Sequence, residues 1–348
     1  MTGQDQRVSD GGQAHAGPDG AIYGDMSPDQ MTEIMVSMAK QLSIFHADAM
    51  KIVDERLASF REEVIKTFVQ PGRANPNAFR DPDFQYVLNE AQEAYARSGD
   101  EALRNTLMNL IARRSLEPKR NRIAVTLNDA VTKAPALTVN EFAELSLVYL
   151  VRYTQSPSVV SFNSLCENIR TQLMPFVPNV TREQSSYWHL VAQGCGTIEM
   201  GQINLYQALR HKYGGVMGRG FDRTQLESHL PADQKHVLDR HIIPCLHDQS
   251  KLQPNARQKS EFLEGAAISG LTTEQLSNVW ALFASTILNQ PDFIALLDGR
   301  VPSVQTLFDV WETTPLSHLH LNAIGIAIAH ANAVQVVGFD ADLKFWIK

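Results

Sequence analysis

The sequence predicts an all-α protein, with a long N-terminal helix followed by a multi-helix globular bundle and at most a short C-terminal strand. Apolar residues recur at three- and four-residue spacing through most of the 348 residues. Helix-starting pairs of the capping-box type occur three times, at Thr138 with Glu141, Thr181 with Gln184 and Thr272 with Gln275. Twofold alternation, which a strand requires, does not extend over any length.

Composition divides the chain into four segments. Residues 1–26 are rich in Gly, Gln, Asp and Ser, which predicts a flexible tail or, alternatively, a paired ribbon that forms on assembly. Residues 27–70 are expected to form the long amphipathic helix. Residues 75–155 are expected to form one helical domain and residues 156–348 a second one.

The long helix has a clear start and an unusual apolar pattern. Ser27 is a good N-cap, Pro28 suits the first helical position, and no Gly or Pro follows until Pro71. The apolar spacing alternates between four and three residues, as in a coiled coil, and then shifts by one residue at Val53. Such a helix either folds back on its own domain or self-associates, and we expect self-association. The expected contact residues are Met35, Met38, Leu42, Phe45, Ile52, Leu57 and Phe60.

Four helices are expected in the following segment. Asp81 and Asp100 are suitable N-caps, Ser98-Gly99 ends the first helix, and Thr138 begins the fourth. The expected ranges are 82–97, 101–115, 120–133 and 138–154.

The C-terminal half contains weaker helix signals. Thr181 should begin a helix that includes Tyr187 and Trp188, and the glycines between 214 and 220 predict a flexible corner. Two further helices are expected, at 272–288 and 322–334. The last of these carries apolar residues around most of its circumference, which predicts burial on most sides. The ending LKFWIK should form a short strand or an ordered tail.

Charge and cysteine content narrow the class of protein. Three widely spaced cysteines indicate reduced thiols in a cytoplasmic protein. No signal peptide and no apolar run long enough for a membrane span is visible in the sequence. The net charge of −7 argues against general nucleic-acid binding.

No arrangement of residues matches a known catalytic mechanism, so we expect a non-enzymatic protein with no cofactor. His236, His241, Cys245 and His247 lie close together in the sequence, but their spacing matches no standard zinc pattern. The alternative is a metal-dependent hydrolase or nuclease that uses His236, His241 and His247.

The densest basic run lies at the junction of two expected helices. It could be a solvated corner, or it could contact the phosphates of nucleic acid or lipid, or an acidic partner. A nucleic-acid-binding regulator is therefore another alternative, although no aromatic residue interleaves with the basic ones. The basic residues are Arg113, Arg114, Lys119, Arg120 and Arg122.

Two stretches resemble a known bacterial family. YARSGDEALRNTLMNLIARR, residues 95–114, and LTVNEFAELSLVYL, residues 137–150, resemble the helical core of abortive-infection alpha (Abi-alpha) proteins. The Gly-rich opening, GGQAHAGPDGAIYGDMS, and the two closing stretches, LHLNAIGIAIAHANAV and LKFWIK, are similar to those of uncharacterised bacterial proteins.

This resemblance implies a role in defence against phage. We therefore expect a protein that self-assembles, recognises a phage component or infection structure, and engages a co-encoded effector that could be membrane-associated.

Overall fold

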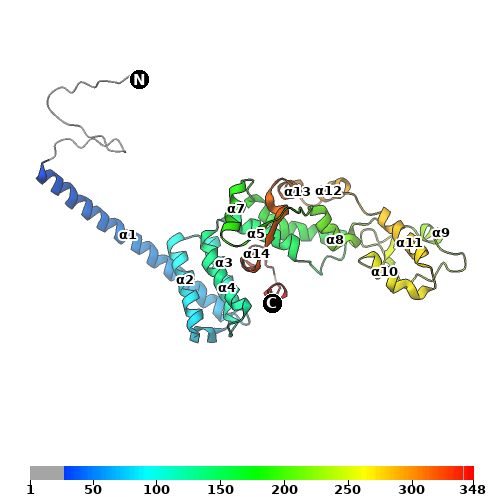
Figure 1. The fold of residues 1–348 in the computed structure, drawn as a ribbon, viewed down its shortest axis with the longest axis horizontal. Coiled ribbons are helices and arrows are strands. Elements are labelled where there is room, and N and C mark those ends of the chain that lie inside the picture. The colour runs from blue at the N-terminus through cyan, green and yellow to red at the C-terminus, as the bar shows by residue number, and fades with distance from the viewer. Residues whose placement is uncertain (1–26, 340) are drawn as a thin grey trace, which may run out of the picture. The chain divides into compact units, whose positions relative to one another are not determined.

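The computed structural model describes residues 27–339 and 341–348 (Figure 1). The predicted all-α class is confirmed, because these residues form fourteen α-helices and only two small two-stranded sheets. The expected Gly-rich tail, residues 1–26, lies outside the described residues. The chain divides into two compact units, Met1–Ala58 and Ser59–Lys348, and the division falls inside the long helix.

The long helix, α1 (Pro28–Val69), has 42 residues and begins where the sequence predicts. Ser27 and Gln30 form a reciprocal cap. The Ser27 backbone N–H donates to Gln30 Oε1 (3.0 Å), and the Gln30 backbone N–H donates to Ser27 Oγ (3.3 Å). These bonds satisfy two backbone donors that would otherwise lack partners in the first turn.

Three of the next four helices are capped as expected, and the third has a cap that the sequence analysis did not identify. They begin at N-cap residues Asp81, Asp100, Asn121 and Thr138. The third of these helices starts two residues later than predicted, because the Asn121 side chain accepts the Ala124 N–H. The bounds are α2 (Pro82–Ser98), α3 (Glu101–Ser115), α4 (Arg122–Lys133) and α5 (Val139–Tyr153).

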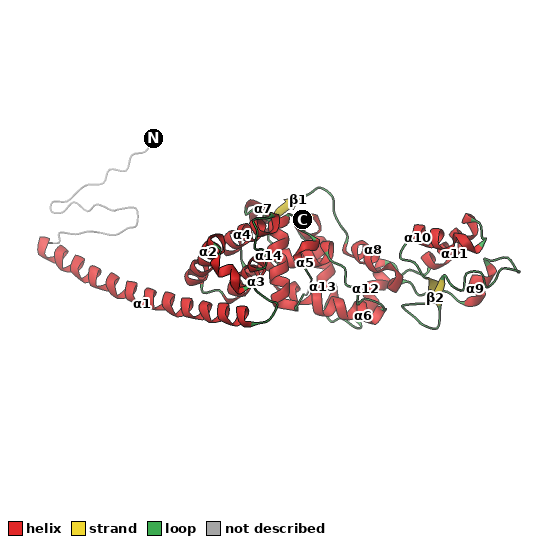
Figure 2. Cartoon of the chain, turned by 90° about the horizontal axis from the view of Figure 1, so that it is seen from below, coloured by secondary structure: helices red, strands yellow, loops and turns green. Residues whose placement is uncertain are grey.

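The last long helix, α14 (Ala323–Val337), packs against α5, α3 and α4. Figures 1 and 2 both show α14 beside α5. Its middle residues are buried without a break from Gly325 to Ala333, as its apolar composition predicts. A Cβ atom at Gly325 would lie 1.9 Å from the Cys195 carbonyl oxygen, so only glycine fits there.

The expected boundary near residue 155 is absent from the structure. One continuous apolar core runs from Phe60 to Ile347, and α14 closes it against helices from the first half of the chain. A second, smaller core lies between Phe221 and Phe283. The described part of Ser59–Lys348 is therefore one compact unit with two cores.

The remaining elements are short. The helices are α6 (Phe162–Asn168), α7 (Gln184–Ala192), α8 (Leu205–Met217), α9 (Arg223–Ser228), α10 (Lys259–Ala266), α11 (Thr273–Ser285), α12 (Gln290–Asp298) and α13 (Val304–Thr313). Strand β1 (Gly196–Ile198) pairs antiparallel with β4 (Leu319–Leu321), and β2 (Ile242–Pro244) pairs with β3 (Leu252–Pro254). Strands of three residues are too short to show alternation in the sequence.

Thr181 does not begin the helix predicted from it. Helix α7 starts at Gln184, and the N-cap residue is Glu183. The Thr181 backbone N–H donates to the buried Glu144 carboxylate (3.3 Å), so it does not bond the Gln184 side chain that a capping box requires.

Two other predictions need correction or refinement. Gly214 and Gly215 lie within α8, after a break in helical geometry at Tyr213 (φ −129°, ψ 22°), whereas the sequence predicted a flexible corner there. The chain ends in a 3₁₀ turn, Leu343–Phe345, which agrees with the predicted ordered tail but not with a strand.

Replacing Thr272 with Ala should lower the free energy of unfolding by about 0.5–2 kcal/mol, the usual cost of losing an N-cap side chain. Thr272 Oγ1 accepts a hydrogen bond from the Gln275 backbone N–H (3.2 Å) at the start of α11. The Thr272 backbone N–H in turn donates to Gln275 Oε1 (2.8 Å). Urea denaturation measures the change. The matched control is Thr273→Ala, at an exposed neighbouring position, which should change stability by less than about 0.5 kcal/mol. Equal effects of the two substitutions would contradict the assigned cap.

Candidate functional site

The basic corner predicted to bind a partner is largely structural. Arg114 is almost fully buried, and its Nη2 contacts Asp83 Oδ2 (2.6 Å) and Asp81 Oδ2 (3.2 Å). Its Nε donates to Asn128 Oδ1 and its Nη1 to the Glu117 carbonyl oxygen. Hydrogen bonds from Asn128 and Arg114 hold the pKa of Asp83 below its usual value. The prediction that Arg114 contacts a partner is therefore wrong, because its guanidinium joins α2, α3 and α4 internally.

Arg113 is also occupied within the chain. Its Nη2 forms an ion pair with Asp342 Oδ1 (2.5 Å), which ties α3 to the C-terminal tail. Only Lys119, Arg120 and Arg122 of the five basic residues are exposed. The exposed positive charge of this corner is smaller than the sequence indicates, and this weakens the expectation of a phosphate-binding surface.

The histidines proposed for a metal site do not converge. His236 is exposed and contacts Asp239 Oδ2 (3.1 Å), whereas the His247 ring lies against Phe162 with a centroid separation of 4.5 Å. The Cys245 thiol donates to the Gly218 carbonyl oxygen (3.2 Å). No cluster of three or more His, Cys, Asp or Glu residues suited to a metal ion occurs in residues 27–339 and 341–348. The metal-dependent alternative with His236, His241 and His247 therefore has no assembled site in this part of the chain.

The apolar face of α1 is the clearest exposed surface feature. Leu42 is 65% exposed and Phe45 is 63% exposed. Ten of the twenty exposed large apolar side chains in the described residues lie between residues 31 and 52. Helical spacing puts seven of them on one side of the helix, and we call these seven the α1 apolar face. They are Met31, Ile34, Met35, Met38, Leu42, Phe45 and Ile52, whereas Val36, Ile44 and Met50 lie on other sides. Single apolar side chains scattered over a surface are ordinary, whereas a concentration of this kind is not.

The predicted contact residues of α1 separate into two groups. Met35, Met38, Leu42, Phe45 and Ile52 are exposed as expected. By contrast, Leu57 is half-buried, and Phe60 is fully buried, with its ring 6.0 Å from that of Tyr95. Phe60 therefore belongs to the core of the second unit and is not available for self-association. No helix in the described residues is long and apolar enough to cross a bilayer.

Two buried carboxyl groups on α5 face α7 and the segment before it. Glu141 accepts from the Thr138 backbone N–H (2.7 Å) and contacts His189 Nδ1 (2.5 Å). Glu144 is completely buried and accepts from Ser186 Oγ (2.8 Å). Burial raises the pKa of Glu144 to about 8. Both carboxyl groups have several partners within the chain, so their geometry supports a structural role.

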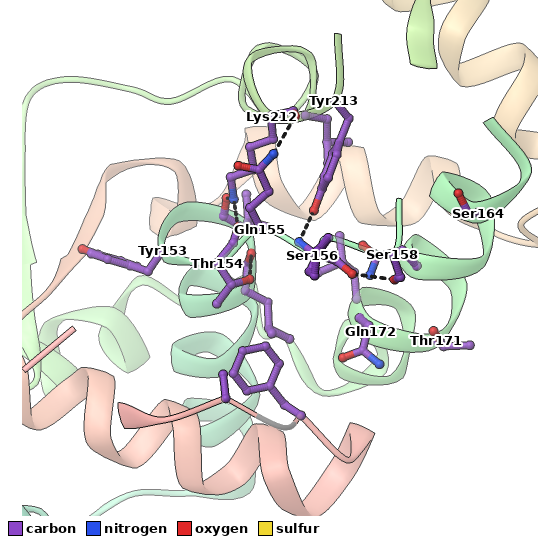
Figure 3. A pocket seen from close by; sticks show the side chains of 18 of the residues that line it. Tyr153, Thr154, Gln155, Ser156, Ser158, Ser164, Thr171, Gln172, Lys212 and Tyr213 are labelled. Carbon is purple, nitrogen blue, oxygen red and sulfur yellow. Dashed lines mark hydrogen bonds between the residues drawn. The ribbon is translucent and has the colours of Figure 1, made fainter. Parts of the chain in front are cut away.

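A cavity of about 910 Å³ lies at the C-terminal end of α5 (Figure 3). Its lining comes from α5, the loop at 154–158, the segment from α6 to Leu173, α8 and the C-terminal tail. No sequence signal marks this cavity. Its polar residues include Gln155 and, more than fifty positions later, Lys212 and Tyr213, and they belong to no motif.

Residues 26–347 match one protein-family model. Because this match covers well over half of the chain, the chain belongs to that family, whose function is unknown. No curated protein and no solved structure matches the chain. The matched region includes all of α1 and all but the last residue of the compact unit, so the long helix is part of what the family model describes.

Replacing Arg114 with Met should lower the free energy of unfolding by about 2–4 kcal/mol, because several charged hydrogen bonds are lost from a buried site. Arg120→Met is the matched control, since Arg120 is exposed, and it should change stability by less than about 0.5 kcal/mol. Urea denaturation of both variants measures the difference. If Arg114→Met is as stable as the control, the buried ion-pair network does not stabilise the helices.

Glu144 should make stability depend on pH between about 4.5 and 8. Its folded pKa is raised above the ordinary value of 4.5, so its stabilising contribution is complete below that value and is lost as the pH rises through about 8. Glu144→Gln should remove this decline. The control is Glu183→Gln, at an exposed position nearby, which should retain it. Denaturation at pH 5, 6.5 and 8 tests this expectation, and parallel profiles for wild type and Glu144→Gln would contradict it.

Proposed function

We propose that this protein assembles through the α1 apolar face and acts by binding other proteins rather than by catalysis. The observation that carries the proposal is the concentration of exposed apolar side chains between residues 31 and 52. In this proposal the occupant of the surface is the same helix of a second copy. The compact unit formed by residues 59–348 then presents its surfaces to a partner effector.

The spacing of the exposed residues supports a second copy as the occupant. Met31, Met38 and Phe45 recur every seven residues, and Met35 with Leu42 interleaves with them. Helices with this repeat pack side chains of one partner into spaces of the other. The charged residues of residues 28–52 fall outside this repeat, so pairing two copies buries no charge in the seam.

A lipid surface fits α1 less well than a second copy does. Residues 28–58 contain five acidic and three basic residues, which gives a net charge of −2. Helices that lie on membranes are typically rich in Lys and Arg on the polar face, because cellular membranes carry anionic lipids. The acidic balance of α1 therefore favours a protein partner.

The biological context that we propose is defence against phage. Its support is the resemblance of residues 95–114 and 137–150 to the Abi-alpha core. In this context the protein is cytoplasmic, responds to a phage component or infection structure, and engages a co-encoded effector, which could be membrane-associated. Nucleic acid is a less suitable partner, since two of the five basic residues are ion-paired within the chain.

Replacing Leu42, Phe45 and Ile52 together with Asp should dissociate the assembly, because a charge buried unpaired in an apolar seam is costly. Light scattering after size-exclusion chromatography measures the molar mass. The matched control is Ser37→Asp, Ser43→Asp and Ala47→Asp, which adds three charges at exposed positions of α1 outside the repeat. The control should keep the wild-type mass and, in a plaque assay, the wild-type protection against phage.

Three outcomes would contradict parts of this proposal. A wild-type chain that is monomeric at micromolar concentration would exclude self-association. The alternative, that α1 folds back on its own chain, would then be favoured. We call the chain with Leu42, Phe45 and Ile52 replaced by Asp the seam variant. If the wild-type chain binds anionic vesicles and the seam variant does not, the partner of α1 is a lipid surface. If the wild-type chain assembles but the seam variant still protects cells against phage, assembly is not required for defence.

A further inference from the structure

The cavity at the end of α5 has a large apolar wall. Leu173 and Leu209 line it together with aromatic residues of the C-terminal tail. Trp346 donates its indole N–H to the Tyr153 carbonyl oxygen (2.7 Å), so the polar group of the indole is already occupied. The Phe345 ring is 72% exposed although it lines the cavity. This wall therefore offers apolar surface to a ligand, and the volume of about 910 Å³ falls within the range of small-molecule sites.

Lys212 gives the cavity a positive charge, and no carboxylate of the described residues pairs with it. Its ammonium group donates to the carbonyl oxygens of Val151 and Thr154, which uses two of its three N–H bonds. None of the ion pairs formed by the described residues includes Lys212. The acidic residue in the described lining is Glu167, and Arg170 already binds both of its oxygens. The carbonyl groups carry only partial charges, so a formal positive charge remains.

A second donor lies on the same side of the cavity. The Tyr213 hydroxyl oxygen accepts the Ser156 backbone N–H (2.8 Å), which leaves the hydroxyl proton available to donate. Figure 3 shows Tyr213 and Lys212 together at one side of the cavity. Burial also lowers the pKa of Lys212 to about 8, because removal from water disfavours the charged ammonium group.

We propose that this cavity binds a small organic acid with an aromatic or aliphatic body, and that Lys212 holds its carboxylate group. The ligand carboxylate supplies the counter-ion that the described residues of the lining do not provide, with the Tyr213 hydroxyl as a second donor. The apolar body of the ligand covers the hydrocarbon wall formed by the leucines and the C-terminal aromatic residues. This site is separate from the α1 apolar face, and the inference does not depend on assembly.

A matched pair of probes tests the role of the charge. 1-Naphthaleneacetate and 1-naphthaleneacetamide have the same aromatic body and differ in the acidic group. Isothermal titration calorimetry with the full chain should show the acid binding at least about tenfold more tightly than the amide, since a hydrogen-bonded charge contributes roughly 1.5 kcal/mol or more. Lys212→Met should abolish this preference, and Lys212→Arg should retain most of it.

A second pair of variants places the binding in the cavity. Ser158 is an exposed loop residue in the lining, and Ser158→Trp should occlude the cavity and weaken both probes at least about tenfold. Ser185→Trp adds the same side chain at an exposed position outside the lining and should leave both affinities unchanged. Because Ser158→Trp retains Lys212, the comparison of Ser158→Trp with Ser185→Trp still tests the proposal if Lys212→Met does not fold.

The proposal would be overturned by any of three results. The wild-type chain could bind neither probe at millimolar concentration. It could bind the amide as tightly as the acid, which would show that Lys212 only caps the C-terminal end of α5 and does not bind the carboxylate. Finally, Ser158→Trp could bind both probes with wild-type affinity, which would place the binding elsewhere, such as on the α1 apolar face.

Discussion

The close contact between α14 and α5 determines how the rest of the compact unit is arranged. Helix α14 has five alanines and one glycine among its 15 residues, so neighbouring backbones can approach it closely. Its polar groups bond across the contact. The Asn332 side chain donates to the Phe142 carbonyl oxygen (3.2 Å) and to Ser146 Oγ (2.8 Å), and Asn109 donates to the Ala331 carbonyl oxygen (3.0 Å). These bonds fix the register of α14 on α5 and α3, because a shifted helix would leave the amides buried without partners.

Helix α5 connects this core to the other features of the unit. Its N-terminal half carries the buried carboxyl groups of Glu141 and Glu144, which bind α7 and the segment before it. The carbonyl groups at its C-terminal end are held by Lys212 and Trp346, which also line the cavity. One helix therefore joins the core, a buried acidic group and the candidate ligand site. A change in its position would affect all three at once.

Local sequence signals predicted local structure well. The caps at Ser27, Asp81, Asp100 and Thr138 identified helix starts because a cap needs only residues within one turn. Burial of α14 also followed from composition alone. The cavity could not be predicted in this way, because its lining comes from segments far apart in the chain.

Two errors have the same origin as the missed cavity. The sequence places Arg114 in a basic run, whereas its environment is set by acidic residues more than thirty positions earlier. Asp81 was identified as a cap and also binds this buried guanidinium. The apolar pattern of α1 shifts by one residue at Val53 and then continues through Phe60, and the burial of Phe60 beside Tyr95 shows that its role changes there. In both cases, contacts distant in sequence decide the outcome.

The position of α14 in the chain has a consequence for synthesis. Residues 154–337 must be translated after α5 before α14 is complete, which takes roughly 10–40 s at the usual rate of ribosomal elongation. During this interval the faces of α3, α4 and α5 that α14 covers have no permanent cover. Helix α1 emerges earlier and needs no later residue for its heptad repeat. If α1 pairs as proposed, helices on neighbouring ribosomes of one messenger RNA can meet while their compact units are still unfinished. The proposed assembly would then begin before folding ends, and copies made from the same messenger RNA would be joined preferentially.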